Sequence, residues 1–82
     1  MKITFATFEQ FREMEKTYNI KAQPLCAGFG LGTNVSAFLR INGNIYARLT
    51  PIAYPEFAGT TKDIGNCRAA TTIEDMLRRA GQ

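Results

Sequence analysis

The segment that most constrains the fold is residues 35–53, VSAFLRINGNIYARLTPIA, where two apolar runs flank Asn42-Gly43-Asn44. This pattern predicts a β-hairpin. A two-residue turn at Asn42-Gly43 would mix apolar and polar side chains on each face. A three-residue loop, residues 42–44, instead places the apolar residues of both strands on one side of the hairpin. We therefore predict the longer loop, with a left-handed backbone at Asn44.

The predicted register gives the two faces of the hairpin different roles. The inner face pairs Ile41 with Ile45, Leu39 with Ala47, Ala37 with Leu49 and Val35 with Pro51, and would join the core. The outer face would carry Phe38 opposite Arg48 and Arg40 opposite Tyr46, which we call the aromatic–arginine set. Such pairs stabilise a sheet by ~0.2–1 kcal/mol each. The alternative is a partner-binding face, since Tyr and Arg are enriched at interface hot spots.

The N-terminal segment predicts a strand followed by a helix. Residues 2–6 alternate apolar and polar side chains, as a strand with one apolar face does. Thr7 with Gln10 fits a capping box, so a helix is expected over residues 8–18. Its apolar stripe is formed by Phe8, Phe11, Met14 and Tyr18, with Asn19 as a left-handed stop.

Residues 21–34, KAQPLCAGFGLGTN, predict a loop with three alternating glycines. Glycine-rich turns can present backbone N–H groups to an anion, but phosphate-binding loops lead into a helix, whereas here a strand follows. The spacing also matches neither dinucleotide nor nucleoside-triphosphate motifs. We keep Gly28, Phe29 and Gly30 as possible contacts of a mobile loop with a partner, and otherwise expect the glycines to serve as a flexible entry to the hairpin.

The C-terminal third predicts one clear element. Pro51 and Pro55 should end the second hairpin strand. We expect a polar loop over residues 56–65 and a short strand over residues 66–71. A helix follows, capped by Thr71 or Thr72, with Glu74 and Asp75 in its first turn and Gly81 as its stop. Its apolar face consists of Ile73, Met76, Leu77 and Ala80, and its last turn carries Arg78 and Arg79.

Taken together, these elements predict an α+β fold in a single domain, residues 1–82. The expected order is β-α-β-β-(β)-α, a small two-layer sandwich in which two helices cover one face of an antiparallel sheet of three to four strands. At 82 residues the hydrophobic core must be modest. We expect a monomer or a small homo-oligomer.

Composition argues against catalysis and metal binding. The chain has no His and one serine, Ser36, so the usual general base and an activated nucleophile are missing. Cys26 and Cys67 stand far apart and predict buried free thiols, or one disulfide if the protein is exported. We expect that the protein is not an enzyme and that it binds neither a cofactor nor a metal ion. Without a long apolar run or a signal peptide, a cytoplasmic protein without membrane contact is expected.

Two functions remain, both using the aromatic–arginine set. The first is a non-enzymatic protein-binding module, for example an inhibitor that phages or mobile elements direct at a host nucleic-acid-handling complex, as anti-CRISPR proteins do. The second is a nucleic-acid-binding domain. The helix–three-strand–helix order loosely resembles double-stranded-RNA-binding domains, and the strands followed by a short helix loosely resemble the arm-binding domains of phage integrases. Both resemblances imply nucleic-acid binding, but neither extends to a motif, so no functional residue is carried across from them. The last helix begins with Glu74 and Asp75 rather than a Lys cluster, and a net charge of +3 offers few phosphate contacts, so protein binding is favoured.

Overall fold

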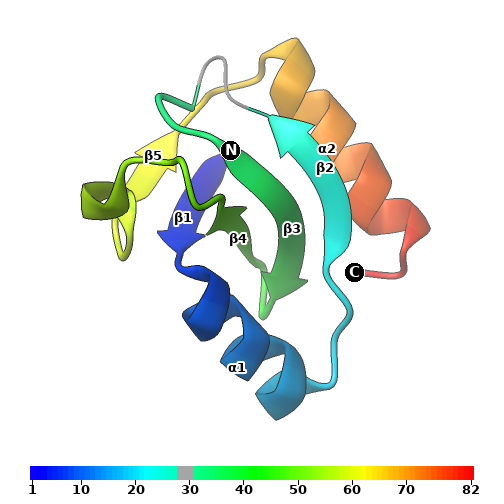
Figure 1. The fold of residues 1–82 in the computed structure, drawn as a ribbon. Helices are drawn as coiled ribbons and strands as arrows, with labels where there is room; N and C mark the ends of the chain where they lie inside the picture. Colours follow the sequence, from blue (N-terminus) through cyan, green and yellow to red (C-terminus); the bar gives the residue numbers. More distant parts are fainter. Residues whose placement is uncertain (28–30) are drawn as a thin grey trace.

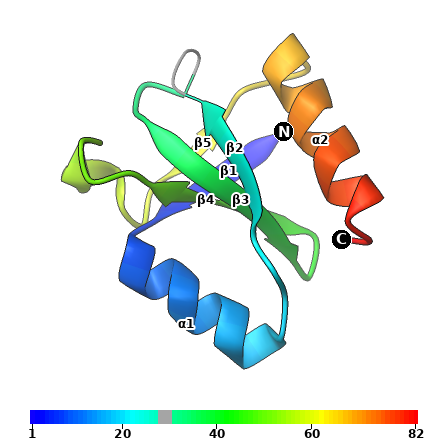
Figure 2. The ribbon, with the colours of Figure 1, turned by 45° about the vertical axis from the view of Figure 1, so that its right-hand side comes forward.

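A five-stranded sheet with one α-helix on each face organises the computed structural model, which describes residues 1–27 and 31–82 (Figures 1 and 2). In chain order the elements are β1 (Lys2–Ala6), α1 (Phe8–Tyr18), β2 (Gln23–Ala27), β3 (Val35–Ile41), β4 (Asn44–Leu49), the 3-10 helix η1 (Pro55–Phe57), β5 (Thr61–Asp63) and α2 (Arg68–Arg79). The strand order in the sheet is β2-β3-β4-β1-β5. The predicted small α+β sandwich is confirmed. The sheet is mixed rather than antiparallel throughout, because β1 pairs with β4 in parallel.

Helix α1 begins and ends where local hydrogen bonds predict. The backbone N–H of Gln10 donates to Thr7 Oγ1 at 3.1 Å, and the N–H of Thr7 donates to Gln10 Oε1 at 3.0 Å, which completes the capping box. At the other end Asn19 adopts φ 52° and closes the helix. The predicted apolar stripe is narrower than expected, since Phe11 is buried whereas Phe8 is 52% exposed.

The hairpin turns over two residues, so the predicted three-residue loop is wrong. Asn42 and Gly43 have φ of 50° and 81°, and Ile41 pairs directly with Asn44. Two consecutive positive φ values suit Asn-Gly, and this turn matches the twist of the strands that it joins. The register therefore pairs Leu39 with Tyr46 and Ala37 with Arg48, so apolar and polar side chains share a face of the hairpin.

Both faces of the sheet are apolar and each is covered by a helix. On one face, Phe11 of α1 packs in a buried cluster with Ala6, Ala37, Leu39 and Ile41. On the other face, Ile73 and Leu77 of α2 pack in a larger cluster with Ile3, Phe5, Leu31, Val35, Phe38, Ile45, Ala47 and Leu49. The expectation of both helices on one face is wrong, because it assumed a sheet with a single buried face.

Three segments differ from their sequence-based assignment. The expected loop over residues 21–34 contains strand β2, and the expected loop over residues 56–65 contains β5 and the last two residues of η1. Helix α2 starts at Arg68, inside the expected strand over residues 66–71. Thr71 and Thr72 therefore lie inside the helix, where their hydroxyls donate to the carbonyls of Cys67 and Arg68. Glu74 and Asp75 accordingly follow the first turn rather than forming it.

The short edge strand β5 is tied to the chain's N-terminus. It pairs with β1, and the amino group of Met1 lies 3.3 Å from Asp63 Oδ1 and donates to the carbonyl of Gly65 at 3.0 Å. The N–H of Gly65 also donates to Asp63 Oδ1 at 2.9 Å. This hydrogen bond, and then the Met1 ammonium, hold the pKa of Asp63 below its ordinary value.

The two-residue turn can be tested with a matched pair of substitutions. Gly43→Ala should lower the free energy of unfolding by about 1–2 kcal/mol, because alanine is strained at positive φ, and no other atom lies within 4 Å of the added Cβ. Asn44→Ala, on an exposed strand residue, should change it by less than about 0.5 kcal/mol. Urea unfolding measures both, and a three-residue loop would make Asn44 the sensitive position instead.

The Asp63 interaction predicts a pH dependence with a defined sign. A carboxyl group whose pKa is lowered by folding stabilises the protein above its unfolded pKa, near 3.8, and this stabilisation is lost as pH falls through the lower folded pKa. At neutral pH, Asp63→Asn should therefore unfold at lower urea concentration than wild type. The two midpoints should converge as pH falls below the folded pKa of Asp63, and a constant difference between them would show that the charge of Asp63 is not involved.

Candidate functional site: a groove between β2 and α2

The aromatic–arginine set does not form one outer face. The two-residue turn places Phe38 and Arg40 on the side of the sheet that α2 covers, and Tyr46 and Arg48 on the side that α1 covers. Phe38 is completely buried, so its role is in the core. The predicted surface of four residues is wrong because a change of one residue in register reverses the faces of one strand relative to the other.

Arg40 joins β3 to the middle of α2 and to Gln82, which follows the helix. Its guanidinium forms an ion pair with Glu74 and donates to the carbonyl of Gln82 at 3.2 Å. Its backbone N–H donates to Gln82 Oε1 at 2.9 Å, and Gln82 Nε2 in turn donates to the carbonyl of Lys21 at 2.8 Å. Arg40 is thus only partly exposed and already has its partners.

Arg48 has its aromatic neighbours on α1 rather than across the hairpin. Its guanidinium carbon lies 5.0 Å from the ring centroid of Phe8 and 5.8 Å from that of Phe11, and its Nε donates to Ser36 Oγ at 2.9 Å. Tyr46 packs against the buried cluster that contains Phe11. The predicted cation–aromatic contact of Arg48 is therefore present, but its rings are those of Phe8 and Phe11 and not that of Phe38.

Two further sequence-based expectations concern the loop and the cysteines. Gly28, Phe29 and Gly30 lie outside the described residues. Cys26 and Cys67 are free and exposed, so the expectation of buried thiols is wrong. Cys26 lies on the edge strand β2, where alternate side chains point away from α2, and Cys67 immediately precedes α2.

Helix α2 forms one wall of a groove whose other wall is β2. The groove has a volume of about 520 Å³ and is lined by Gln23, Leu25, Thr72, Asp75, Met76, Arg79 and Ala80. Leu25 and Met76 also pack against the larger core cluster, so the apolar part of the groove is continuous with the core. The sequence did not predict this site, because Pro24 and the glycines that follow obscured the alternation of Leu25 and Ala27.

Of the two charged residues that line this groove, Asp75 has an ion-pair partner and Arg79 has none among the described residues. Asp75 forms an ion pair with Arg78 at 3.5 Å. Arg79 is exposed, and it makes no ion pair or side-chain hydrogen bond with any residue outside positions 28–30. A cation beside an apolar floor, with its hydrogen-bond donors unused, is a combination suited to recognising a partner.

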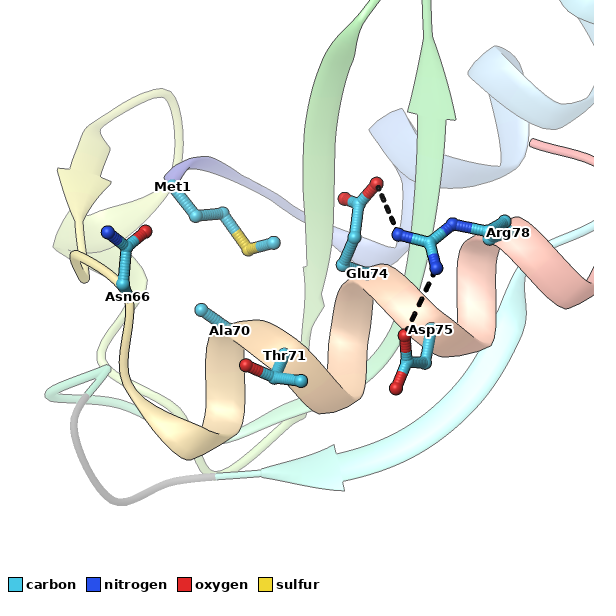
Figure 3. A pocket seen from close by; sticks show the side chains of 7 residues that line it. All are labelled: Met1, Asn66, Ala70, Thr71, Glu74, Asp75 and Arg78. Atoms are coloured by element: carbon cyan, nitrogen blue, oxygen red, sulfur yellow. Dashed lines mark hydrogen bonds and ion pairs between the residues drawn. The ribbon is translucent and has the colours of Figure 1, made fainter.

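A second depression lies on the other side of α2, against the N-terminus (Figure 3). Its volume is about 390 Å³, and its lining combines Met1 and Asn66 with Ala70, Thr71, Glu74, Asp75 and Arg78 of α2. Arg78 lies between Glu74 and Asp75, at 3.9 and 3.5 Å, and Glu74 also pairs with Arg40. Its charges are therefore largely compensated, which makes it the weaker candidate for a binding site.

Other surface features offer less chemistry. Ile52 and Tyr54, 81% and 59% exposed, lie in the turns after β4, where the N–H of Tyr54 donates to Thr33 Oγ1 at 3.0 Å. Among residues 1–27 and 31–82, no cluster of three His, Cys, Asp or Glu side chains could hold a metal ion. No helix in that same part of the chain has the length and apolar character needed to cross a membrane.

Comparison of this chain with protein-family models, with curated proteins and with solved structures finds no match in any of the three.

Proposed function

We propose that this chain is a small non-enzymatic protein-binding domain whose docking surface is the groove between β2 and α2. The observation that carries the proposal is the position of this groove beside an edge strand. Strand β2 pairs only with β3, so one of its edges has no strand neighbour among the described elements. A strand edge, an apolar floor and an arginine without an ion-pair partner among residues 1–27 and 31–82 together offer the backbone, apolar and charged contacts that protein interfaces combine.

The arginines of the hairpin and of the last turn of α2 favour a protein partner over nucleic acid. Binding to nucleic acid needs several cations on one surface, because each phosphate contact contributes through counterion release. Here Arg40 and Arg48 are engaged inside the domain, and Arg78 is paired with two carboxylates. Arg79 is the one lining residue of the groove that bears a positive charge.

The non-enzymatic part of the proposal rests on composition and on the surroundings of Ser36. The chain has no His, and the Ser36 hydroxyl accepts a hydrogen bond from Arg48 Nε. Arginine remains protonated near neutral pH and cannot take the proton of a serine nucleophile.

A narrower form of the proposal names the class of partner. Small binding domains without catalytic groups are typical products of phages and mobile elements, where they inhibit host machinery in the cytoplasm. Under this hypothesis the partner is a host nucleic-acid-handling complex, and inhibition follows from occupying its surface, as anti-CRISPR proteins do. The groove, rather than the hairpin, would make the contact.

Charge reversal within and outside the groove tests the docking surface. We expect Arg79→Glu to reduce capture of a protein partner by roughly 10-fold or more, because juxtaposed like charges cost a desolvated interface at least about 1.4 kcal/mol. Arg12→Glu, the same change at an exposed residue of α1, should capture the partner as wild type does. Affinity capture from lysate, followed by mass spectrometry, compares the three proteins after matched unfolding midpoints confirm that they are folded.

The same experiment separates the protein partner from nucleic acid. The captured material should be destroyed by protease and should survive nuclease. Direct titration with mixed DNA and RNA at low and high salt provides the second readout. Tight binding that falls steeply with salt would overturn the proposal in favour of a nucleic-acid-binding domain, and equal capture by Arg79→Glu and wild type would remove the groove as the docking surface.

A further inference from the structure

The two edges of the sheet differ in how open they are to another strand. Strand β5 at one edge spans three residues, carries Lys62 and Asp63, and is held by the N-terminal amine. Short, charged edge strands resist pairing with other chains. Strand β2 at the other edge spans five residues and carries no charged side chain. The edge beside the groove is thus the more available one.

We propose that the groove binds an extended segment of a partner protein, which adds to the sheet beside β2 and lies between β2 and α2. This inference rests on the proposed protein-binding function and specifies its mode. Figures 1 and 2 show α2 running alongside β2, so a strand placed at this edge would have the helix as its second wall. Backbone hydrogen bonds to β2 would supply part of the affinity, and the groove side chains would supply the specificity.

The open edge of β2 determines which backbone conformation the bound segment must have. Only an extended backbone presents N–H and C=O groups at the spacing of a strand edge, so a helical or folded surface could not satisfy this edge as well. Pro24 offers no N–H, and the pairing of β2 with β3 shifts register between Pro24 and Ala27. Pairing at this edge is therefore limited to a short stretch, and the backbone alone would bind weakly.

The side chains that line the groove determine which residues of the bound segment would fit it. Leu25 and Met76 form an apolar floor, and Arg79 lies three residues beyond Met76 on α2. Three helical residues advance about 4.5 Å, and two strand residues advance about 6.6–6.8 Å on the same face. An apolar residue over Leu25 and Met76 would thus place the residue two positions away near Arg79. The preferred segment carries an aspartate or glutamate there.

Synthetic peptides test the inference without knowledge of the natural partner. The probe is a capped, threonine-rich heptapeptide with a central leucine and an aspartate two positions away on each side, so that it can bind in either strand direction. Matched controls replace both aspartates with lysine, or both threonines next to the leucine with proline. We expect the aspartate peptide to bind wild type roughly 10-fold more tightly than the lysine peptide, with slowed amide hydrogen exchange along β2. The proline peptide should bind more weakly because proline lacks an N–H and favours other backbone angles.

A variant with the opposite charge at residue 79 tests whether this residue selects the peptide. In Arg79→Asp the preference between the aspartate and lysine peptides should reverse, while Arg12→Asp should leave it as in wild type. Binding that ignores residue 79, or that leaves hydrogen exchange of β2 unchanged, would overturn strand addition at this groove. A concentration-dependent dimer in sedimentation, with β2 protected and no peptide bound, would overturn it in favour of a second copy of the chain.

Failure of this inference can be distinguished from failure of the proposed function. If no peptide binds, strand addition is overturned, but nuclease-resistant capture of a protein that depends on Arg79 would still support a protein-binding groove. If neither is observed, both are overturned.

Discussion

The turn at Asn42-Gly43 is the constraint on which the rest of the structure depends. Because both residues adopt positive φ, the hairpin closes over two residues, and this choice decides which side chain of β3 lies on which face of the sheet. In the resulting register Leu39 and Phe38 are both fully buried, although they are neighbours in the strand and point to opposite faces. A strand that is apolar on both sides needs cover on both sides. The two amphipathic helices provide it, one on each face, and no outer face of the hairpin remains.

Local features were predictable from the sequence, whereas pairings between distant residues were not. The capping box of Thr7 and Gln10 and the left-handed Asn19 depend on groups within a few residues, so the bounds of α1 follow from the pattern. The parallel pairing of β1 with β4 joins Ile3 to Ile45 and leaves no local signal. The start of α2 was misplaced because Cys67 precedes it without a side-chain cap. The hairpin register failed for a related reason: the choice assumed one buried face, and only distant helices show that there are two.

The same limit explains why the four residues of the aromatic–arginine set do not share one face of the sheet. Arg40 and Arg48 lie in a stretch of the sequence that contains no carboxylate, so no neighbour in sequence indicates their partners. The partners that neutralise or cover them come from elsewhere in the chain: Glu74 lies 34 residues after Arg40, and Phe8 lies on the first helix. A charge pattern shows which side chains need partners but not where those partners are. The sequence places Arg79 in the last turn of the C-terminal helix, and the fold brings it beside Leu25 and Met76 in the lining of a groove.

An open edge strand presents a physical problem that this domain addresses in two different ways. At β5 the edge is shortened, charged and tied to the N-terminus, which protects it against unselective pairing. At β2 the protection is weaker and of another kind: Pro24 removes one donor, and the shift in register interrupts the ladder. Such an edge resists long, indiscriminate pairing but still allows a short strand. Because the backbone can then contribute only a few hydrogen bonds, selectivity must come from the side chains that line the adjoining groove. An apolar floor next to an arginine without an ion-pair partner among the described residues meets that requirement, whereas the compensated charges of the depression on the other side of α2 do not.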